Sequence, residues 1–196
     1  GNPKRLRLLR IDSADDIPSV MGSRYTQSDF GASHHAIMSD VRNGYLTLVV
    51  GTPCQIAGLR RMYNNAVPDN LVLVDLLCHG VPSPGLFSKH LDYLSSIYSE
   101  RILSFSFRNK RRGRWENSYR FVYQTPTRTV RGNWRADAFY LSFMKGETLR
   151  ECCYRCQYAK KERVGDITLG DYWGIKKMHP DFPYRFGASL LLVSSE

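Results

Sequence analysis

The sequence lacks any long hydrophobic run, since its longest apolar stretches, 46–50 and 71–77, fall far short of the roughly twenty residues that a membrane-spanning helix needs. It also lacks the basic and then apolar opening of a secretory signal peptide. The Gly-x-Gly-x-x-Gly motif is absent, which argues against a Rossmann dinucleotide site, and no repeat recurs at a fixed period. These absences favour a cytoplasmic protein without a membrane span.

The composition describes a chain that can fold around a sizeable core. Of its 196 residues, 42% are hydrophobic and 12% aromatic, which excludes intrinsic disorder and fibrous low-complexity folds. Basic residues outnumber acidic ones by 28 to 18, and the formal net charge is +10. This excess favours an anionic partner, but charge alone does not distinguish nucleic acid, a phosphate compound and an acidic protein.

The first half of the chain predicts an α/β core. Two apolar runs, 46–50 and 71–77, each end in a turn and are followed by helical patterns over 55–63 and 86–98. A strand-helix-strand series of this kind places the two strands parallel, joined by a right-handed crossover. A shorter helix is expected over 33–43, before the first strand.

The second half changes to a mixed α+β character. Residues 102–108 and 119–124 alternate apolar and polar side chains around a basic loop, a pattern typical of a β-hairpin. A helix is then predicted over 134–145, a polar cysteine-bearing segment over 151–161, and short strands over 166–169 and 189–193. Because residues 1–32 show no periodicity, the predicted organisation is an irregular segment over 1–32 and one domain over 33–196.

Five cysteines stand out in a chain expected to be intracellular, where clustered thiols bind metal or do redox chemistry more often than they form disulfides. Cys54 and Cys78 each follow one predicted parallel strand, so their sulfurs should emerge on the same rim of the sheet. Cys153 and Cys156, three residues apart, can face one side of a turn. Such a pair is the usual local unit of a tetrahedral thiolate site.

Four thiolates fit either structural zinc or an iron-sulfur cluster, and ligand softness does not separate the two. Two alternatives stay open at this point. Cys152 lies four residues before Cys156 and could replace Cys153 on a helical turn. Cys54 and Cys78 could instead be small buried core residues, a common fate of free cysteine.

Five motifs, taken in order along the chain, resemble one known family. They are Gly51-Thr52-Pro53-Cys54-Gln55-Ile56-Ala57-Gly58-Leu59, Asp75-Leu76-Leu77-Cys78-His79-Gly80-Val81-Pro82-Ser83-Pro84, Ser106-Phe107-Arg108-Asn109-Lys110, Cys153-Tyr154-Arg155-Cys156 and Gly165-Asp166-Ile167-Thr168-Leu169-Gly170-Asp171-Tyr172-Trp173-Gly174. From about residue 22 to the end, the chain is similar to the C-terminal domain of the coenzyme F-420 hydrogenase/dehydrogenase beta-subunit family. Two departures are Asn109, where an acidic residue is usual, and an end soon after Val193.

The resemblance implies an oxidoreductase, an iron-sulfur flavoprotein that relays electrons between a 4Fe-4S cluster and FAD. It favours iron over zinc and implies Cys54, Cys78, Cys153 and Cys156 as ligands, with 149–175 as the cluster-binding insertion and no assigned role for Cys152. Members of the family usually carry an N-terminal ferredoxin module and a further small domain, so the chain is expected to be a fragment of a longer protein. The implied partners are a ferredoxin or that module, and a small redox acceptor.

A flavin dinucleotide carries a pyrophosphate, for which helix amino-termini and loop amides are ready sites. Thr52 and Gln55, in the turn that opens a predicted helix, are candidates to hold the phosphates or the flavin ring, although Thr52 could simply shape the turn before a proline. Arg24, Arg108 and Lys110 are candidates for the pyrophosphate or for an anionic acceptor. Ordinary surface charge is the alternative interpretation of these three.

Four further candidates flank the proposed cofactors. His79 directly follows an implied ligand and could tune the cluster or deliver a proton to the flavin, which makes it the candidate catalytic residue, with an ordinary structural histidine as the alternative. Asp166 and Asp171 bracket a short predicted strand, and Trp173 follows it where its ring could flank the cofactor. For Trp173, packing is the alternative.

The second hypothesis is a structural zinc module, held by four cysteines, whose basic face binds nucleic acid or an acidic protein. The loop 109–117 combines dense positive charge with a tryptophan, as single-strand-binding sites do. No recognised nucleic-acid module surrounds this loop, so the sequence disfavours nucleic acid and favours an acidic ferredoxin or an anionic cofactor. The acceptor, any use of deazaflavin and the oligomeric state stay open.

Overall fold

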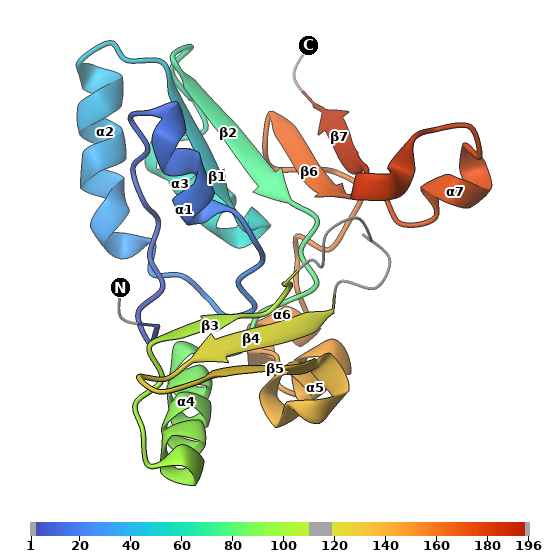
Figure 1. Cartoon of the computed structure of the whole chain (residues 1–196). Coiled ribbons are helices and arrows are strands. Elements are labelled where there is room, and N and C mark those ends of the chain that lie inside the picture. The colour runs from blue at the N-terminus through green and yellow to red at the C-terminus, as the bar shows by residue number, and fades with distance from the viewer. Residues whose placement is uncertain (1–2, 110–118, 195–196) are drawn as a thin grey trace. The chain divides into compact units, whose positions relative to one another are not determined.

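A computed structural model describes residues 3–109 and 119–194 and divides the chain into two compact units (Figure 1). The first unit consists of Gly1–Asp29 and Gly80–Arg155, and the second of Phe30–His79 and Cys156–Glu196. Each unit is therefore assembled from two separate stretches of the chain. The predicted division between residues 32 and 33 stays a prediction.

Helices and strands are interspersed along the chain. The α-helices are α1 (Ile17–Val20), α2 (His34–Arg42), α3 (Pro53–Met62), α4 (Pro84–Tyr98), α5 (Ala138–Met144), α6 (Glu151–Tyr154) and α7 (Ile175–Met178). The strands are β1 (Thr47–Gly51), β2 (Leu71–Leu76), β3 (Ser104–Ser106), β4 (Arg120–Gln124), β5 (Thr129–Asn133), β6 (Ile167–Asp171) and β7 (Ser189–Val193). In the part of the chain that the structure describes, no helix is both long and apolar enough to cross a membrane.

The second unit is built on a four-stranded sheet in the order β1-β2-β6-β7. β1 and β2 run parallel, in register from Thr47 opposite Leu71 to Gly51 opposite Asp75. β6 is parallel to β2, and β7 is antiparallel to β6. The predicted α/β class and its parallel strand-helix-strand core are confirmed, with β7 as an antiparallel strand at one edge.

The crossover helix α3 begins and packs as its sequence dictates. Thr52 occupies the N-cap, and Pro53 takes the first helical position, where its missing N–H costs nothing. Ile56 and Leu59 are fully buried, and so is Leu73 on β2, against which α3 packs. The apolar face of α3 therefore covers the sheet and holds the turn after β1 in place.

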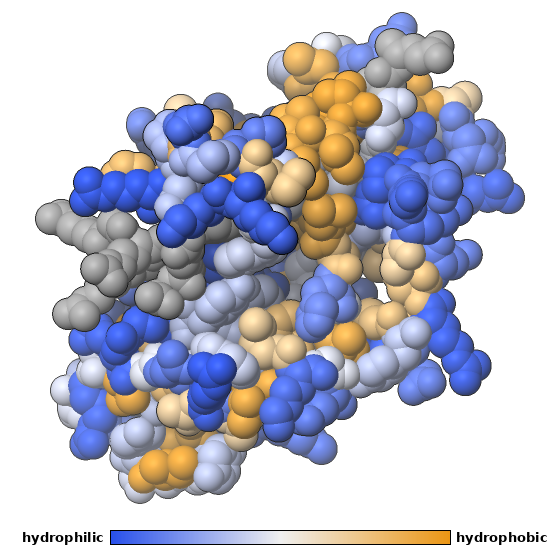
Figure 2. Space-filling model, turned by 90° about the vertical axis from the view of Figure 1, so that its right-hand side faces the viewer, coloured by the Kyte–Doolittle hydropathy of each residue, from blue (hydrophilic) through white to orange (hydrophobic). Residues whose placement is uncertain are grey.

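The edge strand β7 leaves apolar side chains exposed. Leu191 and Val193 retain 56% and 63% of their accessible surface. Figure 2 views the side on which β7 lies in Figure 1, and hydrophobic side chains form a continuous band there. The parallel core of this unit thus ends in a strand whose apolar side chains are not covered by the described residues.

The first unit contains a separate antiparallel sheet in the order β3-β4-β5. β3 and β4 pair antiparallel, which confirms the predicted hairpin, whereas β5 is a third strand that the sequence does not predict. Gly132 on β5 lies opposite Phe121, whose ring occupies the space that a Cβ on this glycine would need. The core of this unit is largely aromatic and consists of Phe87, Leu91, Leu94, Ile102, Phe105, Phe107, Phe121, Tyr123, Phe139, Tyr140 and Phe143.

A buried histidine-aspartate pair crosses this aromatic core. His90 Nε2 on α4 lies 2.9 Å from Asp137 Oδ2, and both side chains are almost completely buried. Asp137 is also the N-cap of α5, because its Oδ1 accepts a hydrogen bond from the Tyr140 amide at 2.8 Å. The pair therefore ties α4 to the start of α5 in the interior of the first unit.

Tyr140 lies fully buried beside this pair, and its hydroxyl has no hydrogen-bond partner among the described residues. Burial raises the pKa of Tyr140 above its ordinary value. Because the unfolded chain then loses this proton first, the stability linked to Tyr140 is fully present below the unfolded pKa of about 10 and is lost as the pH rises above it. We therefore expect Tyr140→Phe to change the free energy of unfolding little near neutral pH and to lessen its fall in alkali.

Urea unfolding from about pH 7 to about pH 11 measures this effect. Tyr93→Phe is the matched control, since Tyr93 is 59% exposed. An alkaline loss of stability as steep in Tyr140→Phe as in the wild-type protein would show that the buried hydroxyl is not its source.

Candidate cofactor site

Cys54 and Cys78 occupy equivalent positions beyond the carboxyl ends of two neighbouring strands. Gly51 and Asp75 are register partners at the carboxyl ends of β1 and β2. Cys54 lies three residues beyond Gly51, and Cys78 lies three residues beyond Asp75. Both thiols are exposed, and neither is in a disulfide. The interpretation of these two cysteines as buried core residues is therefore wrong, and both follow the same edge of the sheet, as the sequence predicts.

Thr52 and Gln55 form a reciprocal cap at the start of α3. Gln55 Oε1 accepts hydrogen bonds from the Thr52 amide and from the Thr52 hydroxyl, each at 3.0 Å. The Thr52 hydroxyl also lies 3.2 Å from Cys54 Sγ, within hydrogen-bonding reach of the sulfur. Thr52 and Gln55 thus shape the turn and place a hydroxyl beside an implied ligand, while their contact with a cofactor stays a prediction.

Cys153 belongs to the first unit and lies close to the chain that follows Cys78. Its amide donates a hydrogen bond to Arg150 O at 2.8 Å, and its Sγ is 4.0 Å from Val81 O. A Cβ built on Gly80, whose φ is +113°, would lie 2.8 Å from Leu149 Cδ1 and 3.3 Å from Cys153 Cβ. Gly80 is two residues from Cys78 along the chain, so glycine at this position leaves the room that Leu149 and Cys153 occupy.

A buried ion pair stands at the carboxyl end of β2. Asp75 is completely buried, and its Oδ2 accepts a hydrogen bond from Arg163 Nη2 at 2.8 Å. Its Oδ1 accepts a hydrogen bond from the Thr168 hydroxyl, which in turn accepts one from Arg163 Nε at 3.2 Å. The carboxylate, the hydroxyl and the guanidinium form a closed network inside the second unit.

The same guanidinium binds the segment that begins with Cys156. Arg163 Nη1 donates hydrogen bonds to Tyr158 O at 3.4 Å and Lys160 O at 3.2 Å, and Nη2 donates a second bond to Leu76 O at 3.1 Å. The Cys156 carbonyl closes a turn by accepting a hydrogen bond from the amide three residues later. Arg163 thus joins the segment after Cys156 to the end of the strand that leads to Cys78.

Asp166 directly precedes β6, at the amino-terminal end of that strand. Its Oδ1 is 2.6 Å from Arg60 Nη2 on α3, and its Oδ2 accepts a hydrogen bond from the Leu73 amide at 2.8 Å. Both carboxylate oxygens are therefore engaged in contacts that hold α3, β2 and β6 together. The structure gives Asp166 these structural contacts, and its role in cofactor binding stays a prediction.

Three other predicted residues follow the carboxyl ends of parallel strands. Asp171 is the last residue of β6, and the Trp173 amide donates a hydrogen bond to Asp171 O at 3.0 Å. Trp173 is 49% exposed, and His79, directly after Cys78, is also exposed. Because β2 and β6 are parallel, these residues follow the same sheet edge as Cys78.

The predicted basic residues lie in other surroundings. In the first unit, the Arg24 guanidinium donates hydrogen bonds to the neighbouring carbonyls of Met21 and Ser23, at 3.5 and 3.3 Å. Arg108 stacks over the Tyr119 ring with its guanidinium carbon 5.3 Å from the centroid. Lys110 and most of the basic hairpin loop lie outside the described residues. A role of these three residues in anion binding stays a prediction.

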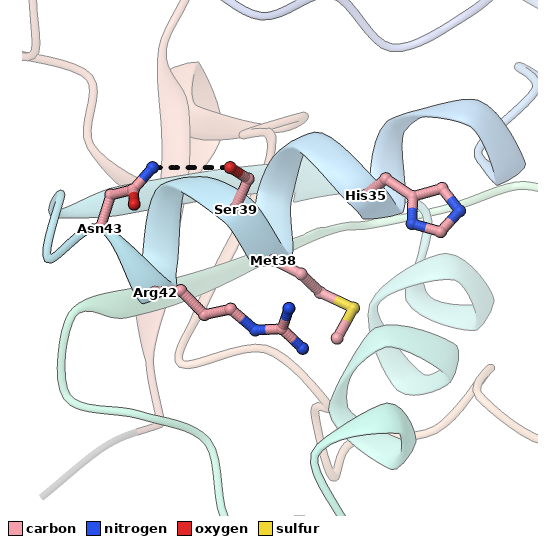
Figure 3. A pocket seen from close by; sticks show the side chains of 5 residues that line it. All are labelled: His35, Met38, Ser39, Arg42 and Asn43. Carbon is pink, nitrogen blue, oxygen red and sulfur yellow. Dashed lines mark hydrogen bonds between the residues drawn. The ribbon is translucent and has the colours of Figure 1, made fainter.

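A shallow hollow of about 420 Å³ lies along α2 and contains none of the predicted site residues. Figure 3 shows that its lining comes from one helix and its end, with Ser39 and Asn43 joined by a hydrogen bond of 3.5 Å. Met38 and Arg42 extend from another side of the same helix. The residues at the carboxyl edge of the sheet, and not this hollow, therefore make up the candidate site.

The thiols fit an iron-sulfur cluster by their chemistry. None of the five cysteines is in a disulfide, and the four implied ligands are exposed or partly exposed. Thiolate sulfur is the donor that such clusters use. Within residues 3–109 and 119–194, no group of three or more histidine, cysteine or acidic side chains is close enough together to hold a metal ion. The ligand set of Cys54, Cys78, Cys153 and Cys156 therefore stays a prediction.

Asp75, Arg163 and Arg60 were not predicted as parts of the site. In the sequence, Asp75 is one polar residue in an apolar strand, and Arg163 is one of several basic residues in a polar segment. The sequence did hold one signal for this ion pair, namely a single aspartate inside a strand predicted to be buried on both faces. A charge is rarely buried without a partner, so a basic residue near Asp75 could have been expected.

The second unit is thus an α/β unit in which exposed thiols follow the carboxyl ends of parallel strands. The family model for the C terminus of the coenzyme F420 hydrogenase/dehydrogenase beta subunit matches residues 46–196, and the chain belongs to this family. The resemblance inferred from the sequence is confirmed. Among curated proteins, no sequence matches the chain.

One similar solved structure is a chain of the xenon-derivatised F420-reducing [NiFe] hydrogenase complex from Methanosarcina barkeri. The two chains share 16% sequence identity, with a TM-score of 0.49, over 87% of this chain and 54% of that one. The present chain thus spans about half the length of that neighbour. A likeness of this degree carries no conclusion about ligands or partners.

Proposed function

We propose that this chain is the cofactor-binding part of an oxidoreductase subunit that relays electrons between a 4Fe-4S cluster and FAD. Membership of the beta-subunit family supports a redox role. The observation that carries the proposal is the matched placement of Cys54 and Cys78, each three residues beyond the register pair of Gly51 and Asp75. Two exposed thiols at one sheet edge are suited to a shared inorganic ligand.

In this proposal Cys54, Cys78, Cys153 and Cys156 hold the cluster. When bound, the two cofactors together convert between single-electron and electron-pair transfer. The Thr52 hydroxyl lies 3.2 Å from Cys54 Sγ, and by turning its proton from Gln55 Oε1 to a thiolate at this position it would lower the electron density of the sulfur.

The flavin phosphates would bind at the amino-terminus of α3, where the helix dipole attracts an anion. Thr52 and Gln55 shape this end of the helix through their reciprocal cap. His79, which is exposed and follows Cys78 directly in the chain, would hold or move a proton. The ring of Trp173 would flank the flavin.

The proposed partner is an acidic ferredoxin or ferredoxin-like module. A formal charge of +10 favours encounter with an acidic protein, and this attraction should weaken with salt. A small-molecule acceptor would receive the electron pair at the flavin.

Anaerobic reconstitution with iron, sulfide and FAD tests the proposal. We expect the wild-type protein to take up iron and sulfide with broad brown absorbance, and we expect Cys54→Ser or Cys156→Ser to abolish it, because serine is a poor cluster ligand. Cys152→Ser is the matched control, since Cys152 is exposed, adjacent to an implied ligand and without an assigned role. It should leave the cluster intact.

Two results would contradict the proposal. The first is a colourless protein that carries zinc in stoichiometric amount after the same treatment, which would favour the structural zinc module. The second is a cluster lost in Cys152→Ser and retained in Cys156→Ser. Flavin released from the protein and identified by mass tests the FAD site separately.

A further inference from the structure

We propose that Arg163 is a positioning residue for the cluster, which clamps the segment after Cys156 onto the end of β2 so that Cys156 and Cys78 are presented together. This inference deepens the proposed function and rests on it. The Arg163 side chain contacts both cysteine-bearing segments, although Arg163 follows both of these cysteines in the sequence. Neither family membership nor any motif assigns it a role.

Arg163 uses its full capacity to donate hydrogen bonds. A guanidinium carries five N–H groups, and Arg163 makes five hydrogen bonds: one from Nε, two from Nη1 and two from Nη2. Three of the acceptors are backbone carbonyls, so the side chain fixes the position of the main chain directly. The Arg163 side chain is 8% exposed, and water therefore competes little for these bonds.

Asp75 and Thr168 fix the orientation of the guanidinium. The Asp75 carboxylate has no exposed surface and balances the charge of Arg163 at 2.8 Å. Thr168 connects the other carboxylate oxygen to Arg163 Nε, so the plane of the guanidinium is set at two points. A planar, doubly held group has less rotational freedom than a lysine ammonium would have.

This orientation determines which chain segments meet. Leu76 O is two residues before Cys78, and Tyr158 O is two residues after Cys156. Both oxygens bind the same guanidinium, one through Nη2 and the other through Nη1. The spacing between the two cysteine-bearing segments is thus set by one rigid group within the second unit.

The test compares Arg163→Lys and Arg163→Gln with wild-type protein, each reconstituted with iron and sulfide. We expect an iron chelator to remove the cluster about 10-fold faster or more from both variants, the usual size of effect for residues that orient metal ligands. The electron paramagnetic resonance spectrum of the remaining reduced cluster should also change. Without iron, amide hydrogen exchange over residues 156–161 should accelerate.

Arg60→Lys is the matched control. Arg60 is also paired with an aspartate and also binds a backbone carbonyl, that of Val164, but it contacts neither the 156–160 segment nor Leu76. It should lose stability without changing the resonance spectrum of the cluster or the exchange of residues 156–161.

The outcomes distinguish a failure of the proposed function from a failure of the positioning role of Arg163. If wild-type protein takes up no cluster, the proposed function fails, and this inference fails with it. If wild-type protein takes up a cluster and the Arg163 variants keep the same spectrum, chelation rate and exchange, the positioning role alone is overturned. The same is true if Arg60→Lys produces changes as large as those of Arg163→Lys.

Discussion

Replacing Asp75 with asparagine is expected to lower the free energy of unfolding by about 3–5 kcal/mol, the usual result of removing one partner of a buried ion pair. Asp75 is completely buried, and its partner Arg163 is nearly so. Asparagine keeps the shape but leaves the guanidinium charge without compensation in a site that water barely reaches. The penalty therefore comes from the remaining charge and not from a cavity.

Chemical denaturation of the metal-free protein measures this change. The double variant Asp75→Leu with Arg163→Met should be less destabilised than Asp75→Leu alone, because it removes both charges. Glu147→Gln is the surface control: Glu147 lies 3.6 Å from Lys145, both side chains are 55% exposed, and its loss should cost about 0.5 kcal/mol or less. A loss for Asp75→Asn no larger than that of Glu147→Gln would disprove the argument.

Gly165→Ala is expected to destabilise the second unit by about 3 kcal/mol, the upper end of what overpacking usually costs. A Cβ on Gly165 would lie 2.7 Å from Asp75 N and from Ile167 O, and 2.9 Å from Leu73 O. All three atoms belong to the backbone of paired strands, so they cannot turn aside as a side chain would. The close approach of residue 165 to β2 therefore requires glycine.

Gly58→Ala is the matched control for this substitution. Gly58 lies within α3, and a Cβ there would meet nothing within 4 Å. Alanine at this position should stabilise the helix by about 0.5–1 kcal/mol, because it restricts the unfolded chain more than glycine does. The two glycine variants should thus shift the denaturation midpoint in opposite directions. If Gly165→Ala shifted the midpoint as Gly58→Ala does, the packing of residue 165 against β2 would be refuted.

The periodic segments of the chain could be predicted closely. The apolar runs 46–50 and 71–77 became β1 and β2, and 189–193 became β7 with the same bounds. β5 was missed because Gly132 and its polar neighbours give Thr129–Asn133 no strand pattern. That strand exists because Phe121 on β4 fills the space above Gly132, a contact between strands that local sequence does not encode.

The candidate site was predictable to a different degree at each residue. Cys54 and Cys78 follow strands whose parallel pairing was foreseeable, so their common edge could be predicted. Asp166 was predicted near the cofactor because it precedes a strand, but its carboxylate is engaged by Arg60 and by the Leu73 amide. The position of a carboxylate along the chain does not reveal which hydrogen-bond donors contact its oxygens in the folded protein.

The sequence by itself determined the α/β class, the family and the thiols that follow the parallel strands, because strand pairing and motif order depend on local pattern and spacing. Only the tertiary structure decided that the guanidinium of Arg163 joins the end of β2 to the segment after Cys156. Asp75 and Arg163 are 88 residues apart along the chain. Their pairing depends on the register of β2 and β6, which sets Thr168 opposite Asp75, and on the exclusion of water around two charges, and both arise only when the sheet has formed.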